Sequence, residues 1–537
     1  MAAVSATARR WLGLIALALG VALIVVDTTV VNVVIPPMIE DLGIDSSQAQ
    51  WVQESYAIVF AALLLVVGRI ADLRGARFIF VTGVIAFGVT SLLAAIAPTG
   101  EILILARFLQ GVGAALILPT TLSLLNYMFT GKARGQAFAV WGATIGAATA
   151  LGPVLGGWLS EHASWRWAFG INIPLTVLIL LLSLVFISRS PHTSGRVDGM
   201  GALLSVAGLG LLAFGIIEGR VYGWMTSQHE FSLFGLTWDN GLSPAFVALL
   251  VGAVVMAAFV WRQVVLSRGG HNDKPLMDVR LFSIASFRNG NIATVIIGLG
   301  EYGIIAVMPL WLQFTLDYSS LQAGLALVPI AIGSFVASGV TFPLAHRISA
   351  LAFVRIGLIV EIIGLAGLGT VAATTDSPWW LIAFVLFIYG AGVGFATAQV
   401  TNVVLADVPE QEGGQSSAIQ STFRQLGSAL GIAALTTVFF SAISAKLKAT
   451  LVDAGMSSQE GDKFSSAVTD SGGAAIAPLA QNPSTASIAD AAHDAMTHGL
   501  ALGSYLAAAF LVLGVIATFF IPNGPVSNDR PDELELR

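Results

Sequence analysis

The sequence contains no cysteine and has few charged residues. None of its 537 residues is Cys and only 10% are charged, whereas 56% are hydrophobic. Without Cys, disulfides, thiolate metal sites and cysteine nucleophiles are excluded. So few charged groups could not cover the surface of a water-soluble globular protein of this length. The composition therefore predicts that lipid surrounds most of the chain.

Signals for several other classes of protein are also missing. The formal net charge is −6 and the basic residues form no stripe of the kind that binds phosphate, so we expect no nucleic-acid partner. The seven His residues form no pair at the spacing of metal ligands. No nucleophile motif or cofactor-binding loop stands out. We therefore expect no metal, no cofactor and no enzymatic activity.

Long apolar runs make up most of the chain. Crossing the roughly 30 Å hydrocarbon layer takes about 20 apolar residues as a helix, and only helices or closed barrels satisfy every backbone polar group there. The runs are continuous, whereas the strands of a barrel alternate in hydropathy. We predict fourteen spanning helices, at residues 11–35, 51–67, 78–97, 102–127, 136–159, 168–187, 199–217, 243–266, 287–312, 322–345, 352–374, 379–405, 415–442 and 500–521. The expected fold is an all-α membrane protein.

An even number of spans places both termini on one side of the membrane. Most of the 25 Lys and Arg residues fall in segments on that side, so the positive-inside rule predicts that both termini are cytoplasmic. The loop after the second span is faintly repeated after the tenth, which is typical of transporters built from two bundles. This repeat predicts six-helix bundles at residues 1–190 and 287–537, with an inserted helix pair and linkers at 191–286.

The longest segments between spans are predicted to face the outside. They cover residues 218–242 and 443–499, and the second is rich in Ser, Ala and Gly, so we expect a mobile external loop within the second bundle. The longest cytoplasmic segment, near 267–286, is too short to be the output domain of a sensor. Movement of a solute between the two bundles is the function that these features favour.

Charged side chains inside the predicted spans are functional candidates, because each costs at least a few kcal/mol in a bilayer. At a rise of about 1.5 Å per residue, Asp27 lies roughly 24 Å from the cytoplasmic start of the first span. Glu54 and Arg107 lie about 5 and 8 Å inside their spans from the outer side. These three side chains can therefore converge in the outer half of the membrane. The full set is Asp27, Glu54, Arg107, Glu301, Glu361 and Arg424.

Proton coupling is the predicted role of several of these groups. The proton affinity of a carboxylate beside an arginine depends on how far both are shielded from water, and hence on conformation. We predict that Asp27, Glu54 and Glu301 carry coupling protons and that Arg107 assists. The alternatives are a structural ion pair for Asp27, contact with interfacial water for Glu54, a buried hydrogen bond for Glu301 and a helix-packing clamp for Arg107.

Further residues are predicted to line a cavity for small hydrophobic or cationic guests. Acids outnumber arginines among the charged residues of the spans, which favours protons or lipophilic cations over anions. Arg424 could equally be a structural partner for a carboxylate, and Glu361 could serve as either a proton or a substrate site. The predicted cavity residues are Asn32, Gln110, Trp141, Trp311, Glu361 and Arg424.

Glycine clusters indicate close contacts between helices, since such contacts need side chains of minimal size. In the fifth span, Gly142 and Gly146 precede a run of small residues interrupted by a proline. This edge is predicted to be a hinge or a tight seal, with generic small-residue packing as the alternative. Its residues are Gly152, Pro153, Gly156 and Gly157.

Taken together, these motifs make the chain resemble the major facilitator superfamily, and within it the drug:proton antiporters with fourteen spans, over nearly its whole length. Leu73 and Ala76 depart from the pattern, because the family usually has basic residues there. The matching positions are Asp27 to Pro36, then Gly68, Asp72, Arg74, Gly75 and Arg77, then Arg107, Gln110, Gly111 and Gly113, then Gly152, Pro153, Gly156 and Gly157, and finally Trp165 to Pro174.

The resemblance implies proton-driven export of small drugs or toxicants across the cytoplasmic membrane by alternating access. It implies that the loop around Asp72 is a cytoplasmic latch, that Arg107 takes part in proton coupling, and that the motif beginning at Gly152 is the one that separates exporters from importers. We expect a monomer whose partners are its substrate, protons and the lipid bilayer. The alternatives are a dedicated exporter of an endogenous metabolite, lipid or siderophore and, less favoured, a sensor or enzyme that moves no solute.

Overall fold

The computed structural model describes residues 6–522, except for 45, 191–194, 229–230, 234–235, 239–240, 269–274, 345–346 and 374–377. In this part of the chain, 14 helical segments are long and apolar enough to cross a membrane. The all-α membrane fold expected from the sequence is thereby confirmed.

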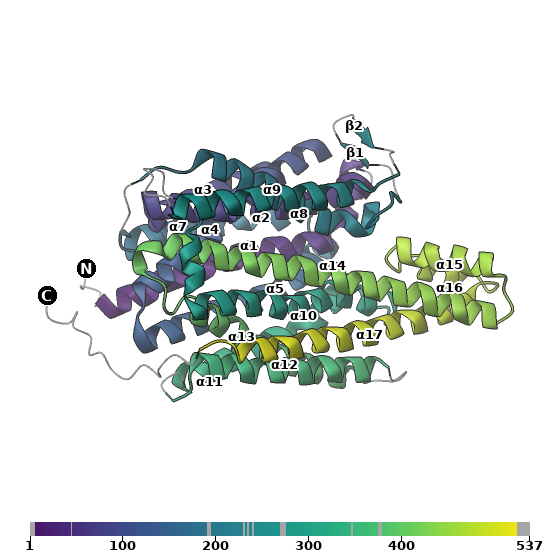
Figure 1. Ribbon diagram of the computed structural model, residues 1–537. Coiled ribbons are helices and arrows are strands. Elements are labelled where there is room, and N and C mark those ends of the chain that lie inside the picture. The colour runs from purple at the N-terminus through teal and green to yellow at the C-terminus, as the bar shows by residue number, and fades with distance from the viewer. Residues whose placement is uncertain are drawn as a thin grey trace.

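The helices run roughly parallel to one long axis (Figure 1). Helices α6 and α7 together make one span, from Trp167 to Phe186. The spanning helices and α6 are α1 (Ala6–Leu42), α2 (Ser46–Arg74), α3 (Ala76–Ala95), α4 (Gly100–Met128), α5 (Gly131–His162), α6 (Trp167–Gly170), α7 (Asn172–Phe186), α8 (Gly199–Tyr222), α9 (Pro244–Arg268), α10 (Ala285–Phe314), α11 (Ser320–Leu344), α12 (Ala350–Ala372), α13 (Trp379–Val404), α14 (Gly413–Asp453) and α17 (Ala486–Thr518).

Two bundles and one additional helix pair make up the fold. Helices α1 to α7 pack mainly on one another, as do α10 to α14 with α17, while α5 packs along α11 and so joins the bundles. Helices α8 and α9 pair with each other, and α8 lies against α2. Only 33% of the most apolar stretch of α8 is buried, compared with 67% in α1. The α8–α9 pair therefore lies on the periphery with most of its apolar surface facing outward.

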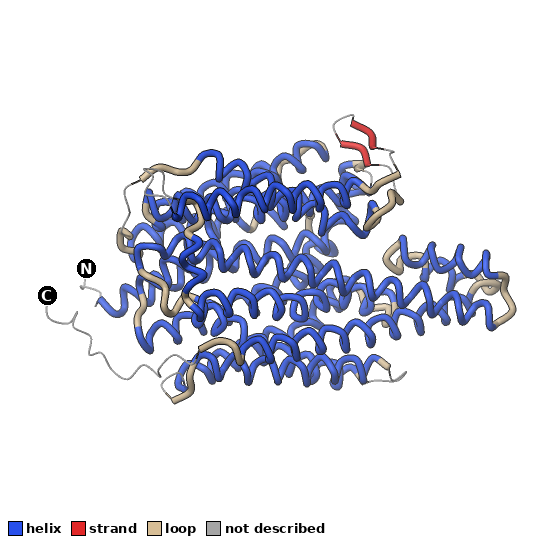
Figure 2. The backbone as a smooth tube through the Cα atoms, in the orientation of Figure 1, coloured by secondary structure: helices blue, strands red, loops and turns tan. Residues whose placement is uncertain are grey.

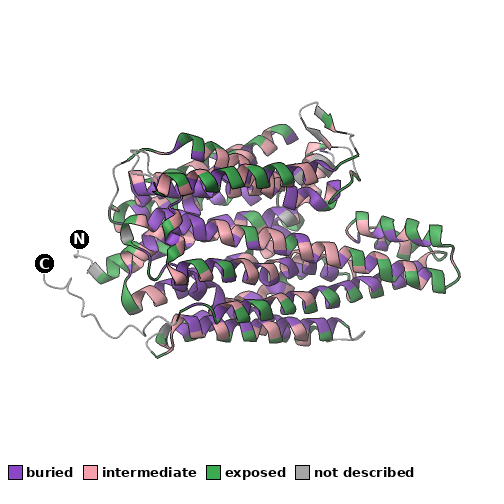
Figure 3. Cartoon of the chain, viewed as in Figure 1, coloured by how far each residue is buried: buried purple, intermediate pink, exposed green. Residues whose placement is uncertain are grey.

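Glycines allow the helix backbones to approach closely inside each bundle. A Cβ atom at Gly113 of α4 would lie 2.8 Å from the backbone nitrogen of Phe87 in α3. In the second bundle, a Cβ at Gly298 of α10 would lie 2.9 Å from the backbone of Gly427 in α14. Buried positions face these contacts and exposed positions face outward (Figure 3). Small residues, together with buried Leu, Val and Phe, thus give the dry packing that helices need within lipid.

The two ends of the molecule differ. We call the end where α1 begins at Ala6 and α17 ends at Thr518 the terminal end (Figure 1). At the opposite end, α14 and α17 extend beyond the other helices and carry α15 (Ser458–Asp470) and α16 (Ile476–Gln481). Figure 2 shows this extension as helix joined by short turns.

The segment 443–499, predicted to be a loop, is instead largely helical. Ile443, Leu447 and Leu451 are buried at intervals of four residues, so α14 keeps one apolar face over this region. Ser457 and Glu460 form a capping box at the start of α15. Part of the Ser, Ala and Gly content that suggested a loop packs between helices, as Ser465, Ala492 and Ala495 do, and the rest lies on exposed helix faces and turns.

The segment 218–242 also differs from the predicted loop. Helix α8 continues to Tyr222, and two short antiparallel strands follow, β1 (Phe231–Leu233) and β2 (Leu236–Trp238). The Phe231 ring lies 5.7 Å from that of Phe214 and 5.3 Å from that of Tyr222, both edge-on. The hairpin therefore packs on the end of α8, because its aromatic side chain finds apolar partners there.

Candidate functional site

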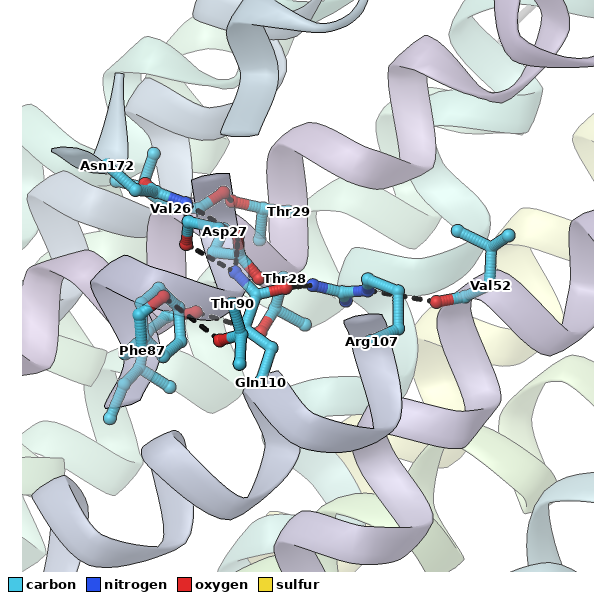
Figure 4. A network of polar contacts seen from close by, with 12 residues as sticks. Val26, Asp27, Thr28, Thr29, Val52, Phe87, Thr90, Arg107, Gln110 and Asn172 are labelled. Carbon is cyan, nitrogen blue, oxygen red and sulfur yellow. Dashed lines mark hydrogen bonds and ion pairs between the residues drawn. The ribbon is translucent and has the colours of Figure 1, made fainter. Parts of the chain in front are cut away.

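A buried carboxylate in α1 lies at the centre of the first bundle. Asp27 is 0% exposed, and its Oδ2 lies 2.6 Å from Arg107 Nη1 of α4. The other oxygen, Oδ1, accepts hydrogen bonds of 2.8 Å from Gln110 of α4 and of 2.8 Å from Asn172 of α7 (Figure 4). Three helices thus meet at one carboxylate. The predicted convergence of Asp27 and Arg107 is present.

Arg107 is held from several sides. Its Nε donates to the backbone oxygen of Val52 in α2 at 2.9 Å, and its Nη1 donates to Gln110 Oε1 at 2.7 Å (Figure 4). The guanidinium carbon lies 4.3 Å from the centre of the Tyr56 ring, within cation–π range. Arg107 therefore ties α2 to the same carboxylate that joins α1, α4 and α7.

Two members of this network were not expected as site residues. Ser91 of α3 accepts a hydrogen bond from Gln110 at 2.9 Å, and Asn172 donates to Asp27. Asn172 belongs to the motif from Trp165 to Pro174, which was the only signal for it in the sequence. Ser91 gave no signal, because a lone Ser in an apolar run usually bonds to its own helix.

The same motif also contacts the part of α1 that lies away from the terminal end. Trp165 Nε1 donates to Asp41 Oδ2 at 3.0 Å, and Arg166 forms an ion pair with this carboxylate. The hydrogen bonds from Arg166 and then Trp165 lower the pKa of Asp41 below its usual range. The motif thus contacts two acids of α1, Asp27 and Asp41, and fixes that helix at two points.

A second polar cluster lies in the second bundle. Glu301 of α10 accepts a hydrogen bond of 2.8 Å from Thr397 of α13, and its backbone oxygen accepts one of 2.6 Å from Tyr389. Glu361 of α12 is 0% exposed, and neither carboxyl oxygen has a hydrogen-bond partner among the described residues. The guanidinium of Arg424 lies 5.2 Å from the ring centre of Trp141, across the boundary between the bundles. The structure thus brings together predicted residues from both bundles.

Several buried polar atoms near this cluster lack hydrogen-bond partners within the described ranges. An unsatisfied buried polar atom costs about 1–3 kcal/mol, so such a group of atoms indicates a place where water or a ligand binds. On α5, α11, α12 and α14 these atoms include Trp141 Nε1, Ser334 Oγ, Ser338 Oγ, Glu361 Oε1 and Oε2, Gln420 Oε1, Ser421 Oγ and Arg424 Nη1.

Other predicted cavity residues lie elsewhere. Gln110 belongs to the Asp27 network. Trp311 donates to Thr497 of α17 at 3.2 Å and packs in the core of the second bundle. The side chain of Asn32 lies outside the described part of the structure.

Glu54 of α2 contacts an acid that sequence reasoning missed. The predicted seventh span ended at residue 217, which left Glu218 in an external loop. In the structure Glu218 belongs to α8 and is 1% exposed, and its carboxyl group lies within hydrogen-bonding reach of that of Glu54. The last turn of α8 is buried at Glu218, Gly219 and Tyr222.

The predicted latch residue Asp72 joins the two bundles at the terminal end. Its Oδ1 accepts a hydrogen bond of 2.6 Å from the backbone nitrogen of Gly414, and its Oδ2 accepts one of 3.0 Å from that of Gln415. These amides begin α14, where a helix carries a partial positive charge. A Cβ atom on Gly68 would lie 2.6 Å from the backbone oxygen of Gly414, so Gly68 permits the contact.

The other predicted latch residues act within the first bundle. Gly75 has a φ of 89°, a left-handed conformation that suits glycine, and it separates α2 from α3. Arg77 donates to the backbone oxygen of Leu184 at the end of α7, at 2.9 Å. Arg74 is exposed. Of the five predicted latch residues, Gly68 and Asp72 contact the second bundle.

A second contact between the bundles at the terminal end was not predicted. Arg134 of α5 donates to Asn402 of α13 through Nε, at 2.8 Å to Oδ1, and through Nη2, at 3.0 Å to the backbone oxygen. Gln399 donates to the backbone oxygen of Gly135 at 3.2 Å. This end of the molecule is therefore closed by hydrogen bonds on two helix pairs.

The glycine motif of α5 lies between the two bundles. A Cβ on Gly156 would lie 3.0 Å from the backbone oxygen of Val30 in α1. A Cβ on Gly157 would lie 2.7 Å from the backbone of Leu321 in α11, and Gly324 of α11 approaches Pro153 in the same way. The motif thus connects the helix that carries Asp27 to the facing bundle.

Comparisons with known proteins agree with this architecture. The chain is 33% identical to the multidrug efflux pump LfrA of Mycolicibacterium smegmatis, over 95% of each chain. It is 33% identical to the puromycin resistance protein pur8 of Streptomyces alboniger, over 82% of this chain and 84% of that one. Among solved structures, the proton:xylose symporter XylE superimposes with a TM-score of 0.61 at 13% identity, covering 96% of this chain and 97% of XylE.

The sequence profile of one protein family matches most of the chain. Residues 17–432 match the Major Facilitator Superfamily, and this range holds the Asp27 network, the Asp72 contact and the glycine motif. With the two bundles and 14 candidate spans, the match identifies the chain as a multi-pass membrane protein of the major facilitator superfamily.

Proposed function

We propose that the chain exports small hydrophobic or cationic molecules across the cytoplasmic membrane in exchange for protons, by alternating access. The observation that carries this proposal is the buried Asp27–Arg107 pair, which joins four helices through one ionisable carboxylate. Export of drugs is supported by relatives whose names describe multidrug efflux and puromycin resistance.

A proton on Asp27 would loosen this network. Protonation removes the negative charge that attracts Arg107 and weakens the hydrogen bonds from Gln110 and Asn172. Contacts among α1, α4 and α7 then weaken together. Inward movement of one proton releases about 2.3 kcal/mol per 100 mV of membrane potential, which is comparable to the net value of one or two such bonds.

The second polar cluster is the proposed substrate site. Trp141 comes from the first bundle, whereas Glu301, Glu361 and Arg424 come from the second, so a guest held there contacts both moving parts. The aromatic ring suits a flat or cationic guest, and the carboxyl groups suit a positive charge. Glu301, with its partner Thr397, is proposed as a proton or cation site.

The terminal end is the proposed cytoplasmic gate. The contacts of Asp72 and Arg134 hold it shut in this conformation, and both must break for substrate to enter from the cytoplasm.

We assign residues 1–190 and 287–537 to the two bundles and 191–286 to the inserted pair. We also propose a monomer as the working unit.

A second candidate is export of one compound that the cell itself makes. The chain is 31% identical to the cephamycin export protein CmcT of Amycolatopsis lactamdurans, over 82% of this chain and 86% of that one. A substrate screen separates the two candidates. In the reconstituted protein we expect several unrelated lipophilic cations to collapse an imposed pH gradient, and a response to no more than one compound would favour the second candidate.

Replacing Glu301 with Gln is expected to weaken the binding of a lipophilic cation about tenfold, which corresponds to roughly 1.4 kcal/mol. The amide keeps the size of the side chain and can still accept the hydrogen bond from Thr397, but it carries no charge. The dissociation constant of a fluorescent cation and of a neutral analogue should be measured at one pH. Equal weakening of both ligands would contradict the assignment.

A methyl group at Gly157 is expected to reduce transport several-fold. Its Cβ atom would lie 2.7 Å from backbone atoms of Leu321, which cannot move aside as a flexible side chain could, and such overpacking costs about 1–3 kcal/mol. The matched control is Gly339→Ala in α11, where nothing lies within 4 Å of the added atom. Transport rates per folded molecule should be compared, and equal rates would show that the motif does not seal the bundles.

A further inference from the structure

The inserted helix α8 places a buried acid against the first bundle. Glu218 shares one face of α8 with Phe214 and Tyr222, since the three lie four residues apart. On α2, Trp51 and Glu54 lie three residues apart, and the Trp51 ring stacks on that of Phe214 with centres 6.3 Å apart. The contact between α2 and α8 therefore consists of two stacked aromatic rings with the two carboxyl groups beside them.

The chemistry of this contact requires a proton. The carboxyl group of Glu218 lies within hydrogen-bonding reach of that of Glu54, and neither Glu218 oxygen has a donor from the rest of the described chain. An ionised carboxylate only accepts hydrogen bonds, so two carboxylates bond to each other only when one of them carries a proton. Two carboxyl groups within hydrogen-bonding reach, one of them on a fully buried side chain, do not both remain ionised.

Aromatic side chains lie beside the pair, and one arginine supplies a positive charge. Phe231 of the β hairpin packs on Phe214 and covers the outer end of the contact. Arg220 of α8 lies with its guanidinium 4.3 Å from the ring centre of Phe440 in α14, and it interacts electrostatically with Glu54 and with Asp470 at the end of α15.

The charged groups that interact with the pair or with Arg220 come from α2, α8 and α15. The remaining titratable groups of the hairpin loops, His229, Glu230 and Asp239, lie outside the described residues. Arg220 thus interacts with Glu54, with the facing bundle and with the helical extension.

We propose that Glu54 and Glu218 form a second proton-binding site, distinct from Asp27, which gives the inserted helix pair a part in the transport cycle. The site binds one proton between two carboxyl oxygens and releases it unchanged. When the proton is present, α8 is bonded to α2. When the proton leaves, the two carboxylates repel each other and attract Arg220, which moves away from Phe440. The contact of α8 with α14 then changes. The role in transport rests on the proposed function, whereas the existence of the site does not.

The site is tested by infrared difference spectroscopy of the full-length protein in liposomes, without substrate. We expect the wild type to show the carbonyl band of a protonated carboxylic acid that both Glu218→Gln and Glu54→Gln remove. Glu161→Gln is the control, because Glu161 is an exposed acid at the end of α5 and should leave the spectrum unchanged. Persistence of every carbonyl band in both variants would overturn the proposal. The two variants provide independent tests if one of them fails to fold.

Its role in transport is tested by counting protons moved per substrate. We expect Glu218→Gln to lower this ratio or to shift the pH profile of transport, while the dissociation constant of a lipophilic cation at fixed pH is unchanged. A merely structural carboxyl pair would change stability and leave the ratio intact. An unchanged ratio and pH profile would overturn the role in transport. If the wild type moves no substrate, the proposed function fails and the infrared result still decides the site.

Discussion

Replacing Asp27 with Asn is expected to reduce transport driven by a pH gradient by about tenfold or more, while exchange of substrate without a gradient continues. The amide cannot bind and release a proton at physiological pH, so the step that couples proton movement to the helices is lost. Uptake of a fluorescent cation into proteoliposomes, with and without an imposed pH gradient, measures both quantities. Asp453→Asn is the control, because this exposed carboxylate lies at the end of α14, far along the chain from the network.

The same variant is expected to lose stability, and this effect must be separated from coupling. Removing one partner of a buried ion pair leaves Arg107 uncompensated, which costs about 3–5 kcal/mol. A double variant, Asp27→Asn with Arg107→Gln, removes both charges and should recover much of the melting temperature. If it also recovered gradient-driven transport, the pair would be structural and the proposal for Asp27 would be wrong.

The charge of Asp27 and Arg107 and their depth along their helices explain why this part of the network could be predicted. Charged residues in apolar runs are rare and costly, and the rise of a helix places Asp27 and Arg107 at matching depths. Asn172 and Ser91 are neutral and of ordinary frequency in helices, so depth alone did not select them. Asn172 owes its role to the Asp27 carboxylate it contacts, and Ser91 owes its role to Gln110, from which it accepts a hydrogen bond; only the folded structure reveals these partners.

Partners that lie far apart in the sequence were also beyond prediction. Asp72 was singled out by its motif, but its hydrogen-bond donor Gly414 lies 342 residues away at the start of another helix. A backbone amide leaves no side-chain signal in the sequence. Glu218 was missed for a different reason, because the apolar run ends just before it and its burial depends on the packing of α8 against α2.

One helical segment was wrongly predicted to be a loop, because the prediction relied on its composition and not on the spacing of its apolar residues. The segment 443–499 has the residues of a loop, yet Ile443, Leu447 and Leu451 give it the apolar spacing of a helix. The fold class, the number of spans and the central acids were thus accessible from local sequence. The second proton site and the extension depended on contacts between elements.

Replacing Asp72 with Asn is expected to shift the conformational equilibrium about tenfold toward the state open at the terminal end. The amide offers one acceptor where the carboxylate offers two, and it loses the attraction to the positive end of α14, a loss of about 1–2 kcal/mol. A change of 1.4 kcal/mol corresponds to a tenfold change in population. Transport should slow, because the state open at the terminal end then becomes harder to leave.

The absence of Cys makes this shift directly measurable. Spin labels on cysteines introduced at Arg74 and Ala406, both exposed at the terminal end, report the distance between the bundles there. A second pair at Glu161 and Asp317 reports the opposite end, where alternating access requires the reverse change.

The control for this experiment is Asp407→Asn. Asp407 also lies at the terminal end, where its carboxylate accepts a hydrogen bond from Ser286 of its own bundle at 2.6 Å and attracts Arg134 of the other bundle. Neutralising it leaves the contact of Asp72 intact, so both distance distributions should shift far less than in Asp72→Asn. If Asp72→Asn left the terminal-end distances as in the wild type, the contact with Gly414 would be a static packing feature. An equal shift in the Asp407 variant would point to loss of surface charge as the cause. A shift confined to the Asp72 variant, opposite in sign at the two ends, is the outcome that a gate built on this carboxylate requires.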